Sequence, residues 1–431
     1  MGGGKSGSTL FALEALNLVE DVYPALVLAP LRVANSTWLG EVNKFDNFRH
    51  LRVSAIAARR NPKTSATAAD RAARVETPAD IYTLPYGNLT WLVEYLGDEW
   101  PFRTIVADEV TRLKSFRLQQ GGANARALGK RAFRSERFIG LTGTPSPNGV
   151  KDLWGQTWFI DKGHRLGKSF SAFSMRWFVT GYDGFSIKPK ETAQAEIEGL
   201  LADVCRTIEG PPVDDAIVAP IYVDLPPKAR ELYRQMEKTA FAEIAEMGVE
   251  APNAAVKVNK LLQIASGNLY GEDGWEPVHD AKLEALESIV EEANGAPVLV
   301  QYNYQADLER ILKHFRTARH LDADPKTEDR WNRGEIPILV AHGASAGHGL
   351  NLQDGGHILA RYSFDWNFEI YAQILERIGP LRQKQSGYNR RVYDYPILAR
   401  DTFDENVFER HGEKCSVQDM LLAALRRQKE K

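Results

Sequence analysis

Residues 103–109 read Arg-Thr-Ile-Val-Ala-Asp-Glu, a short apolar run that ends abruptly in two carboxylates. A run of this length, bounded by polar residues, is typical of a strand that is buried on both faces of a parallel sheet. Ligands bind at the carboxyl edge of such sheets. Residues 25–30 and 138–142 repeat the pattern, so the first part of the chain is predicted to be an α/β lobe.

The same pattern returns near the end of the chain, in strand-like runs at 297–302, 336–341 and 392–395. The residues between the two parts are mainly helical in pattern, and one long helix is expected over 227–247. The fold class is therefore predicted to be α/β, with two parallel-sheet lobes joined by a mainly helical insertion. The predicted boundaries are 1–165, 166–280 and 281–431.

Length and composition indicate a globular chain with more than one domain. The chain has 431 residues, of which 43% are hydrophobic and 26% are charged. No apolar run approaches membrane-spanning length, so no membrane partner is expected. The formal net charge of -3 gives no overall nucleic-acid signature, so any such binding must come from a local groove. Cys205 and Cys415 lack a metal-ligand spacing and are expected to be buried in a reducing compartment.

The N-terminal residues form a candidate phosphate-binding loop. Gly2, Gly3 and Gly4 would let backbone N–H groups crowd around phosphates. Lys5 would reach the outer phosphates, and the Ser6 hydroxyl would bind Mg²⁺. The apolar run that follows suits a helix, whose positive N-terminal end would point at the phosphates.

Two other interpretations of this stretch stay open. It also fits a flexible Gly/Ser terminus or the M-G-x-x-x-S acylation pattern. The leading glycine of a phosphate loop, and the strand that normally feeds it, would fall before Met1. We therefore expect an upstream in-frame segment, or a separate upstream gene, to supply that strand.

The pair Asp108-Glu109 predicts the second half of an ATPase site. Asp108 would hold Mg²⁺ through water, and Glu109 would orient and deprotonate the attacking water. The alternative for an isolated pair is an acidic helix cap. Here the pair lies between the phosphate-loop pattern and residues 141–145, Leu-Thr-Gly-Thr-Pro, and that order favours the ATPase.

At this point the chain resembles a family, the Snf-type, chromatin-remodeller-like branch of the superfamily two DEAD/DEAH-box helicases, and in particular its bacteriophage members. The resemblance implies RecA-like lobes. The segments that carry it are 4–6, 28–33, 83–89, 108–114, 141–148, 345–353, 373–377 and 401–405.

The resemblance implies ATP and Mg²⁺ in a cleft between the lobes. Gln373 would contact the nucleotide, and Arg377 would stabilise charge on the transferred phosphate. The next arginine position of the family pattern is Pro380 in this sequence. Arg382 lies two residues later, so its catalytic role depends on a local shift of the chain.

The resemblance also implies contacts with a nucleic-acid backbone. Arg32, Asn88, Lys114 and Ser345 lie in or beside the segments that make them. A solvated surface charge is the alternative for Arg32 and for Lys114.

The expected function is an ATP-dependent DNA translocase or helicase that hydrolyses ATP while it moves on double-stranded DNA. We expect a monomer in the cytoplasm, which is that of a bacterial host if a phage encodes the chain. The alternatives are a nucleic-acid-binding motor remnant, with its ATP site disabled by N-terminal truncation, and an RNA-directed helicase.

Overall fold

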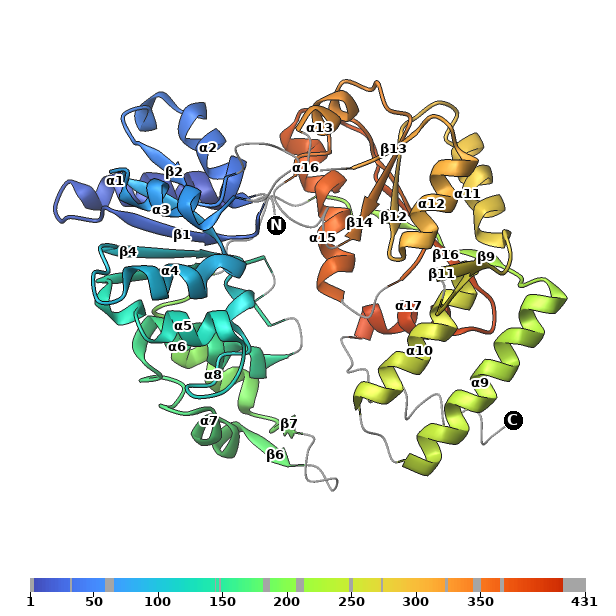
Figure 1. Ribbon diagram of the computed structural model, residues 1–431, viewed down its shortest axis with the longest axis horizontal. Coiled ribbons are helices and arrows are strands. Elements are labelled where there is room, and N and C mark those ends of the chain that lie inside the picture. The colour runs from blue at the N-terminus through green and yellow to red at the C-terminus, as the bar shows by residue number, and fades with distance from the viewer. Residues whose placement is uncertain are drawn as a thin grey trace. The chain divides into compact units, whose positions relative to one another are not determined.

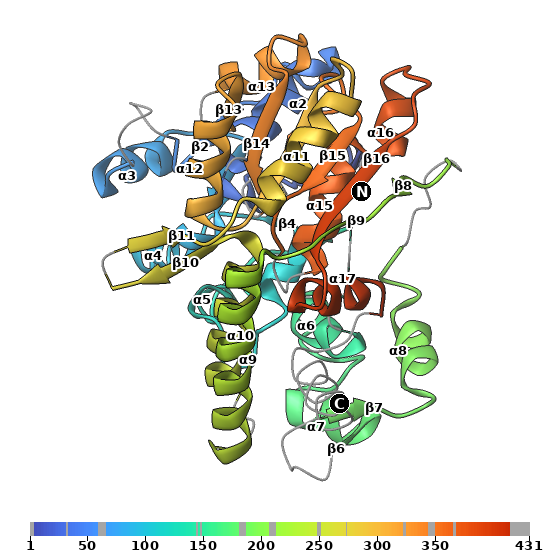
Figure 2. The same ribbon diagram turned by 90° about the vertical axis from the view of Figure 1, so that its right-hand side faces the viewer.

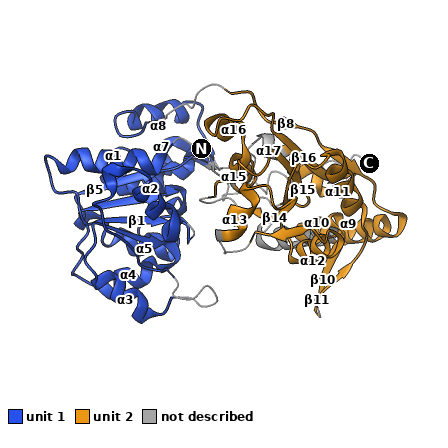
Figure 3. Ribbon diagram, turned by 90° about the horizontal axis from the view of Figure 1, so that it is seen from above, with its two compact units in different colours: residues 1–210 blue, residues 211–431 orange. Residues whose placement is uncertain are grey.

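The computed structural model describes residues 4–31, 33–58, 66–143, 145–146, 149–180, 187–206, 213–247, 251–272, 274–321, 325–343, 350–364 and 368–413. Gly2, Gly3, Arg32 and Ser345, for which roles are predicted above, lie outside these residues. The chain divides into two compact units, residues 1–210 and 211–431 (Figure 3).

Unit 1 is built on a parallel sheet with the strand order β2-β3-β1-β4-β5 (Figure 1). Its strands are β1 (Ala25–Ala29), β2 (Val53–Ala55), β3 (Ile81–Pro85), β4 (Thr104–Asp108) and β5 (Arg137–Leu141), with a separate hairpin of β6 (Phe178–Thr180) and β7 (Ile187–Pro189). Its α-helices are α1 (Lys5–Asn17), α2 (Trp38–Lys44), α3 (Ala68–Glu76), α4 (Leu89–Leu96), α5 (Ala123–Gly129), α6 (Leu153–Asp161), α7 (Phe170–Trp177) and α8 (Ala193–Leu201).

The apolar runs form the middle strands because they are covered on both faces. β1, β3 and β4 are buried along their whole length. On β1, Val27 packs into the core that contains Leu10 and Leu13 of α1. Its neighbours Leu26 and Leu28 point to the opposite core, as the period of two in a strand requires.

Unit 2 contains a second parallel sheet, with the order β13-β14-β12-β15-β16-β8, and β9 also pairs with β16. Its strands are β8 (Ile217–Val218), β9 (Ile221–Val223), β12 (Val298–Tyr302), β13 (Ala318–His320), β14 (Ile338–His342), β15 (Ile358–Arg361) and β16 (Tyr393–Ala399), with a hairpin of β10 (Asn268–Gly271) and β11 (Gly274–Pro277). Its α-helices are α9 (Pro227–Met247), α10 (Ala251–Ser266), α11 (Ala281–Glu292), α12 (Gln305–His314), α13 (Pro325–Asn332), α15 (Phe368–Ile378), α16 (Pro380–Gln385) and α17 (Phe403–Glu413). The predicted α/β class with two parallel sheets is confirmed.

The segment 166–280, predicted to be an insertion between the lobes, is shared between the two units. Phe173 and Trp177 of α7, and Ile197 of α8, belong to the main core of unit 1. In contrast, β8 and β9 extend the sheet of unit 2, and α9 and α10 pack against each other there (Figure 2). The boundary between the compact units, after residue 210, falls inside the predicted insertion.

None of the described helices combines the length and the apolarity needed to cross a membrane. Cys205, expected to be buried, is exposed, because it follows the last turn of α8 instead of facing a core. Cys415 lies outside the described residues.

Candidate functional site

The N-terminal end of helix α1 has the properties of an anion-binding site. Gly4 immediately precedes it with φ 65° and ψ 24°, a left-handed conformation that glycine adopts at little cost. Within the described residues, no side chain caps this end of the helix. The first backbone N–H groups therefore remain available at the positive end of the helix dipole. Lys5 and Ser6, both half-buried, lie in this first turn.

The acidic pair follows directly from the buried strand β4. Asp108 is the last residue of that strand, and Glu109 adopts φ 63° and ψ 61°. A non-glycine residue in this left-handed region carries a strain of about 1–3 kcal/mol. Such strain persists where the surrounding structure fixes it, and it concentrates at functional sites. The conformation of Glu109 is therefore consistent with a catalytic role.

Three elements bring partners to these carboxylates. The Lys5 ammonium lies 3.7 Å from Glu109 Oε1. The Thr142 hydroxyl, just after β5, donates to Glu109 Oε2 at 3.5 Å. The Trp38 indole N–H donates to Asp108 Oδ2 at 3.1 Å. The predicted residues Lys5, Asp108 and Glu109 thus form one cluster at the carboxyl edge of the sheet in unit 1.

The electrostatics of the cluster favour a bound cation. Burial raises the pKa of Asp108 above its usual range, and the neighbouring charge of Glu109 acts in the same direction. Lys5 and the hydrogen bond from Trp38 oppose this shift. The buried Tyr86 hydroxyl donates to the Asp108 carbonyl oxygen at 3.2 Å, and burial raises the pKa of this phenol well above its usual value. A cation beside Asp108 would favour its ionised form.

These residues fit a nucleotide-bound Mg²⁺ better than a metal held by protein alone. Among the described residues, no cluster of three or more His, Cys, Asp or Glu side chains could hold a metal ion. Mg²⁺ is usually bound by one or two carboxylates together with phosphate oxygens and water. Asp108, with Ser6 at the start of α1, supplies that kind of donor set.

The residues predicted from the second lobe lie together within unit 2. Gln373 and Arg377 are one turn apart on α15 and are buried, with 1% and 6% of their surfaces exposed. The Arg377 guanidinium donates from Nε to the Gln373 carbonyl oxygen at 3.2 Å and from Nη1 to the Leu350 carbonyl oxygen at 3.5 Å.

A break between two helices brings Arg382 to the same place. Helix α15 ends at Ile378, Gly379 caps the next helix, and Pro380 occupies the first position of α16, where a missing N–H costs nothing. Arg382 Nη1 then donates to the Leu350 carbonyl oxygen at 3.2 Å. Burial lowers the pKa of Arg382. The two arginines thus share an acceptor, although the second is displaced in the sequence.

The predicted nucleic-acid residues are described only in part. Asn88 ends the short 3-10 helix Tyr86–Asn88 that follows β3 and is half-buried. The Lys114 ammonium, which was expected to contact a phosphate backbone, lies 4.0 Å from the buried Asp152 carboxylate.

Sequence analysis assigned no site role to Trp38, Tyr86 or Thr142, which contact the acidic pair. Tyr86 and Thr142 lie within segments that carry the family resemblance, and Trp38 follows such a segment by five residues. Those positions are the signal in the sequence.

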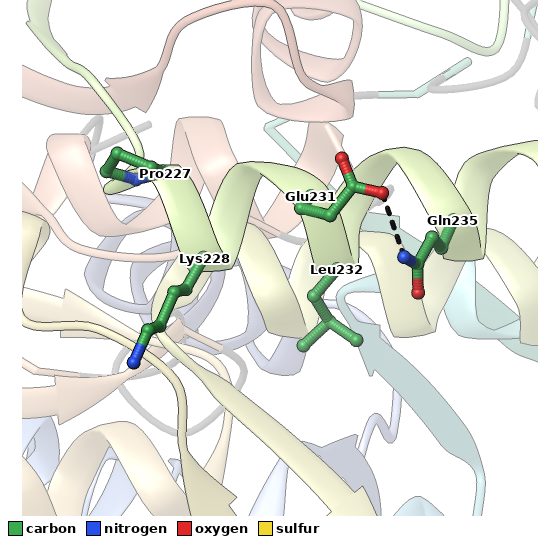
Figure 4. Close-up of a pocket in the computed structure, with 5 residues that line it drawn as sticks. All are labelled: Pro227, Lys228, Glu231, Leu232 and Gln235. Atoms are coloured by element: carbon green, nitrogen blue, oxygen red, sulfur yellow. Dashed lines mark hydrogen bonds between the residues drawn. The ribbon is translucent and has the colours of Figure 1, made fainter.

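Unit 2 also has a surface hollow whose lining comes from one helix, α9 (Figure 4). Gln235 donates to Glu231 across one helical turn at 2.8 Å. The hollow contains none of the predicted site residues. Its lining residues are Pro227, Lys228, Glu231, Leu232 and Gln235.

The fold and the clusters define a class of protein. One parallel lobe carries a lysine at a helix N-terminus beside a strand-terminal acidic pair, and a second parallel lobe carries buried arginines. These are features of a two-lobed, RecA-like nucleotide hydrolase. The model of the SNF2-related domain matches residues 1–264, which is more than half of the chain, and the chain belongs to this family.

Relatives agree with this membership. The protein p41 of Acyrthosiphon pisum secondary endosymbiont phage 1 is 50% identical over 438 residues, which cover 99% of this chain and 94% of p41. The ISWI chromatin-remodeling complex ATPase ISW1 of Saccharomyces cerevisiae is 22% identical over 462 residues, which cover 98% of this chain but 38% of ISW1. The chain therefore spans about two fifths of the length of that relative. By family, the chain is an ATP hydrolase of the helicase type.

A solved structure, the Sulfolobus solfataricus SWI2/SNF2 ATPase core in complex with dsDNA, is similar at 22% identity. The match covers 95% of this chain and 84% of that chain, with a TM-score of 0.40.

Proposed function

We propose that the chain is a DNA-dependent ATPase that translocates on double-stranded DNA. The observation that carries the proposal is the cluster of Lys5, Asp108 and Glu109, where a phosphate-binding helix end meets a buried, strained acidic pair. Family membership supports the ATPase activity. Double-stranded DNA is inferred as the polymer because the relatives include a chromatin-remodeling ATPase.

Unit 1 residues divide the chemistry between them. Lys5 and the first N–H groups of α1 bind the outer phosphates of ATP, while Ser6 and Asp108 hold Mg²⁺. When bound, Mg²⁺ neutralises charge that develops on the phosphates. Glu109 accepts a proton from the water whose oxygen bonds to the terminal phosphorus, as the bond from that phosphorus to the leaving oxygen of ADP breaks. Thr142 orients the Glu109 carboxylate for this step.

Unit 2 supplies the opposing charges in this proposal. Arg377 and Arg382 stabilise the negative charge of the transition state, and Gln373 contacts the nucleotide. A site assembled from two units can link hydrolysis to movement, since closing and opening around ATP displaces the units relative to each other. Backbone contacts through Arg32, Asn88, Lys114 and Ser345 would transmit that movement to DNA without reading its sequence.

The test is the rate of ATP hydrolysis by the whole chain with duplex DNA, single-stranded DNA, RNA and no polymer. We expect the greatest stimulation by duplex DNA, and a stimulation that falls steeply with salt because phosphate contacts release counterions. Translocation is then measured by displacement of a triplex-forming strand from duplex DNA. Stronger stimulation by RNA would favour an RNA-directed enzyme, and polymer binding without hydrolysis would favour a motor remnant.

A further inference from the structure

Helix α15 is attached to unit 2 along two adjacent stripes. Ile374 and Ile378 of one stripe pack into the apolar core against the sheet. On the other stripe, Arg377 donates to the Leu350 carbonyl oxygen. Near the start of the helix, Ile370 closely approaches Gly343, where an added Cβ would lie 2.6 Å from Ile370 Cγ2. The position of α15 therefore determines where Arg377 lies.

A fully buried guanidinium lies beneath this helix, at the end of strand β15. Arg361 has no exposed surface and pairs with Asp394 of β16, which is also fully buried. Its Nε lies 2.8 Å from Asp394 Oδ1, and its Nη2 lies 2.9 Å from Oδ2. Its Nη1 donates to Gln301 Oε1 of β12 at 2.9 Å. Arg361 thus joins three neighbouring strands.

Helix α15 contacts the same guanidinium through Tyr371. The ring of Tyr371, in the first turns of the helix, lies over Arg361 with 3.5 Å from the guanidinium carbon to the ring centroid. The Tyr371 hydroxyl also points to Asp394 Oδ2 at 3.4 Å. Burial raises the pKa of this phenol to about 12, so it remains a neutral donor.

Stability alone is a weak reason for such an arrangement. A buried ion pair adds little net stability relative to well-packed apolar residues of similar volume, because desolvation offsets the attraction. Apolar contacts, however, are not directional, whereas a planar guanidinium fixes its partners in angle and distance. Arg361 can therefore set the rotation and height of α15, which the apolar contacts of Ile374 and Ile378 leave less sharply defined.

We propose that Arg361, stacked on Tyr371 and paired with Asp394, is a positioning residue that holds α15 so that Arg377 reaches the transferred phosphate. This role rests on the proposed function. It concerns kcat more than ATP affinity, because Arg361 acts through the helix that carries Arg377.

The test replaces the pair without leaving an unpaired buried charge. In the whole chain, R361M/D394V should lower kcat on the order of ten- to a hundredfold, as expected for a small displacement of a catalytic group. The KM for ATP should change less than twofold. Tyr371→Leu, which keeps the ion pair but removes the ring, should have a similar effect, whereas Tyr371→Phe should keep the parental kcat. If R361M/D394V does not fold, Tyr371→Leu decides the question.

Ile358→Ala is the matched control, because it creates a cavity on the same strand but in the core on the opposite face, a cluster that includes no residue of α15. Hydrogen exchange of α15 provides a readout that does not depend on hydrolysis. It should increase locally in R361M/D394V and in Tyr371→Leu, but not in the control. Parental kcat in both variants, a loss no larger than in Ile358→Ala, or unchanged exchange would overturn the proposal. An inactive parent would refute the proposed function instead, and the exchange measurement would still test the positioning role.

Discussion

At the scale of single residues, the candidate site is made by a few side chains whose environments differ from those of ordinary surface charges. Glu109 is mostly buried, adopts a left-handed conformation and lies within reach of Lys5 and Thr142. Asp108 is buried beside it with a raised pKa. A buried acidic pair costs folding free energy, so its presence is best explained by chemistry.

Glu109→Gln should lower kcat by about 10²–10⁴-fold while ATP still binds, because the proton acceptor is lost and Asp108 remains. Steady-state hydrolysis and fluorescent-nucleotide binding measure the two effects. Glu136→Gln is the control, since it makes the same chemical change at an exposed carboxylate in unit 1. Parental turnover by Glu109→Gln would refute the assignment of Glu109 as the base.

Asp108→Asn should raise the thermal midpoint of unfolding at neutral pH by a few degrees while it abolishes hydrolysis. The pKa of Asp108 is higher in the folded state than in the unfolded state. Above the folded-state pKa, keeping this carboxyl ionised therefore costs free energy of folding. This penalty disappears below the unfolded pKa of about 3.9, where the group is protonated in both states. The gain should therefore shrink as pH falls towards that value. A gain that is constant across pH would contradict the explanation.

At the scale of secondary-structure elements, short interruptions decide where functional groups lie. The Gly379 break between α15 and α16 allows Arg382 to share an acceptor with Arg377. A continuous helix would instead place residues 377 and 382 on different faces, since five residues rotate the chain well past one turn. The break between the helices thus offsets the displacement of Arg382 in the sequence.

Arg377→Ala should lower kcat on the order of 10³-fold, as removal of an arginine finger does. Arg382→Ala should cause a loss of comparable size, because both guanidiniums meet at Leu350. Arg333→Ala, at an exposed arginine of unit 2, serves as the control. Normal kcat in Arg382→Ala alone would show that a single finger operates, and normal kcat in both would remove unit 2 from the catalytic model.

A buried histidine just before α11 should make the stability of unit 2 decrease as pH falls. His279 Nε2 donates to the Ile264 carbonyl oxygen at 2.8 Å, and the Ala281 N–H donates to Nδ1 at 3.3 Å. Burial lowers the pKa of His279 to about 4, and Lys282 and Arg310 add to this effect. The imidazole is therefore neutral in the folded state.

Between the folded pKa of about 4 and the usual value of 6.5, the unfolded chain binds more protons at His279 than the folded chain. Its contribution to stability is therefore present above pH 6.5 and is lost as pH falls towards 4. His279→Gln should flatten the dependence of the melting temperature on pH in this window. An equal slope in His279→Gln and the parent would contradict the prediction.

At the scale of the whole molecule, each unit has its own sheet and its own apolar cores. The predicted catalytic residues are divided between the units, with the acidic pair in unit 1 and the arginines in unit 2. Each unit should therefore fold by itself, whereas ATP hydrolysis should require both units.

Residues 1–206 and 213–431, expressed separately, should each show folded circular dichroism and cooperative unfolding. Neither should hydrolyse ATP at more than about a hundredth of the rate of the intact chain, because transition-state charge would lack the opposing group. Hydrolysis at the intact rate by residues 1–206 alone would contradict a site shared by two units.

The sequence alone determined the elements whose signal is local. The runs at 25–30 and 103–107 became β1 and β4, because continuous apolar residues suit strands that are covered on both faces. The run at 138–142 became β5, a half-buried strand at the edge of the sheet. The long helix over 227–247 was also predicted with its observed bounds. Strand β15 was missed, since four residues that end in a charged arginine give little periodic signal.

Only the tertiary structure decided which elements share a core and which side chains meet. Trp38 and Asp108, 70 residues apart, form one hydrogen bond. Arg361 and Asp394 form a fully buried pair that no local pattern indicates. The segment 166–280 is helical in sequence, but packing assigned its parts to different units. The physical reason is that neighbouring residues encode local conformation and apolar faces, whereas the partner that covers each face is chosen by the shape and free energy of the assembled core.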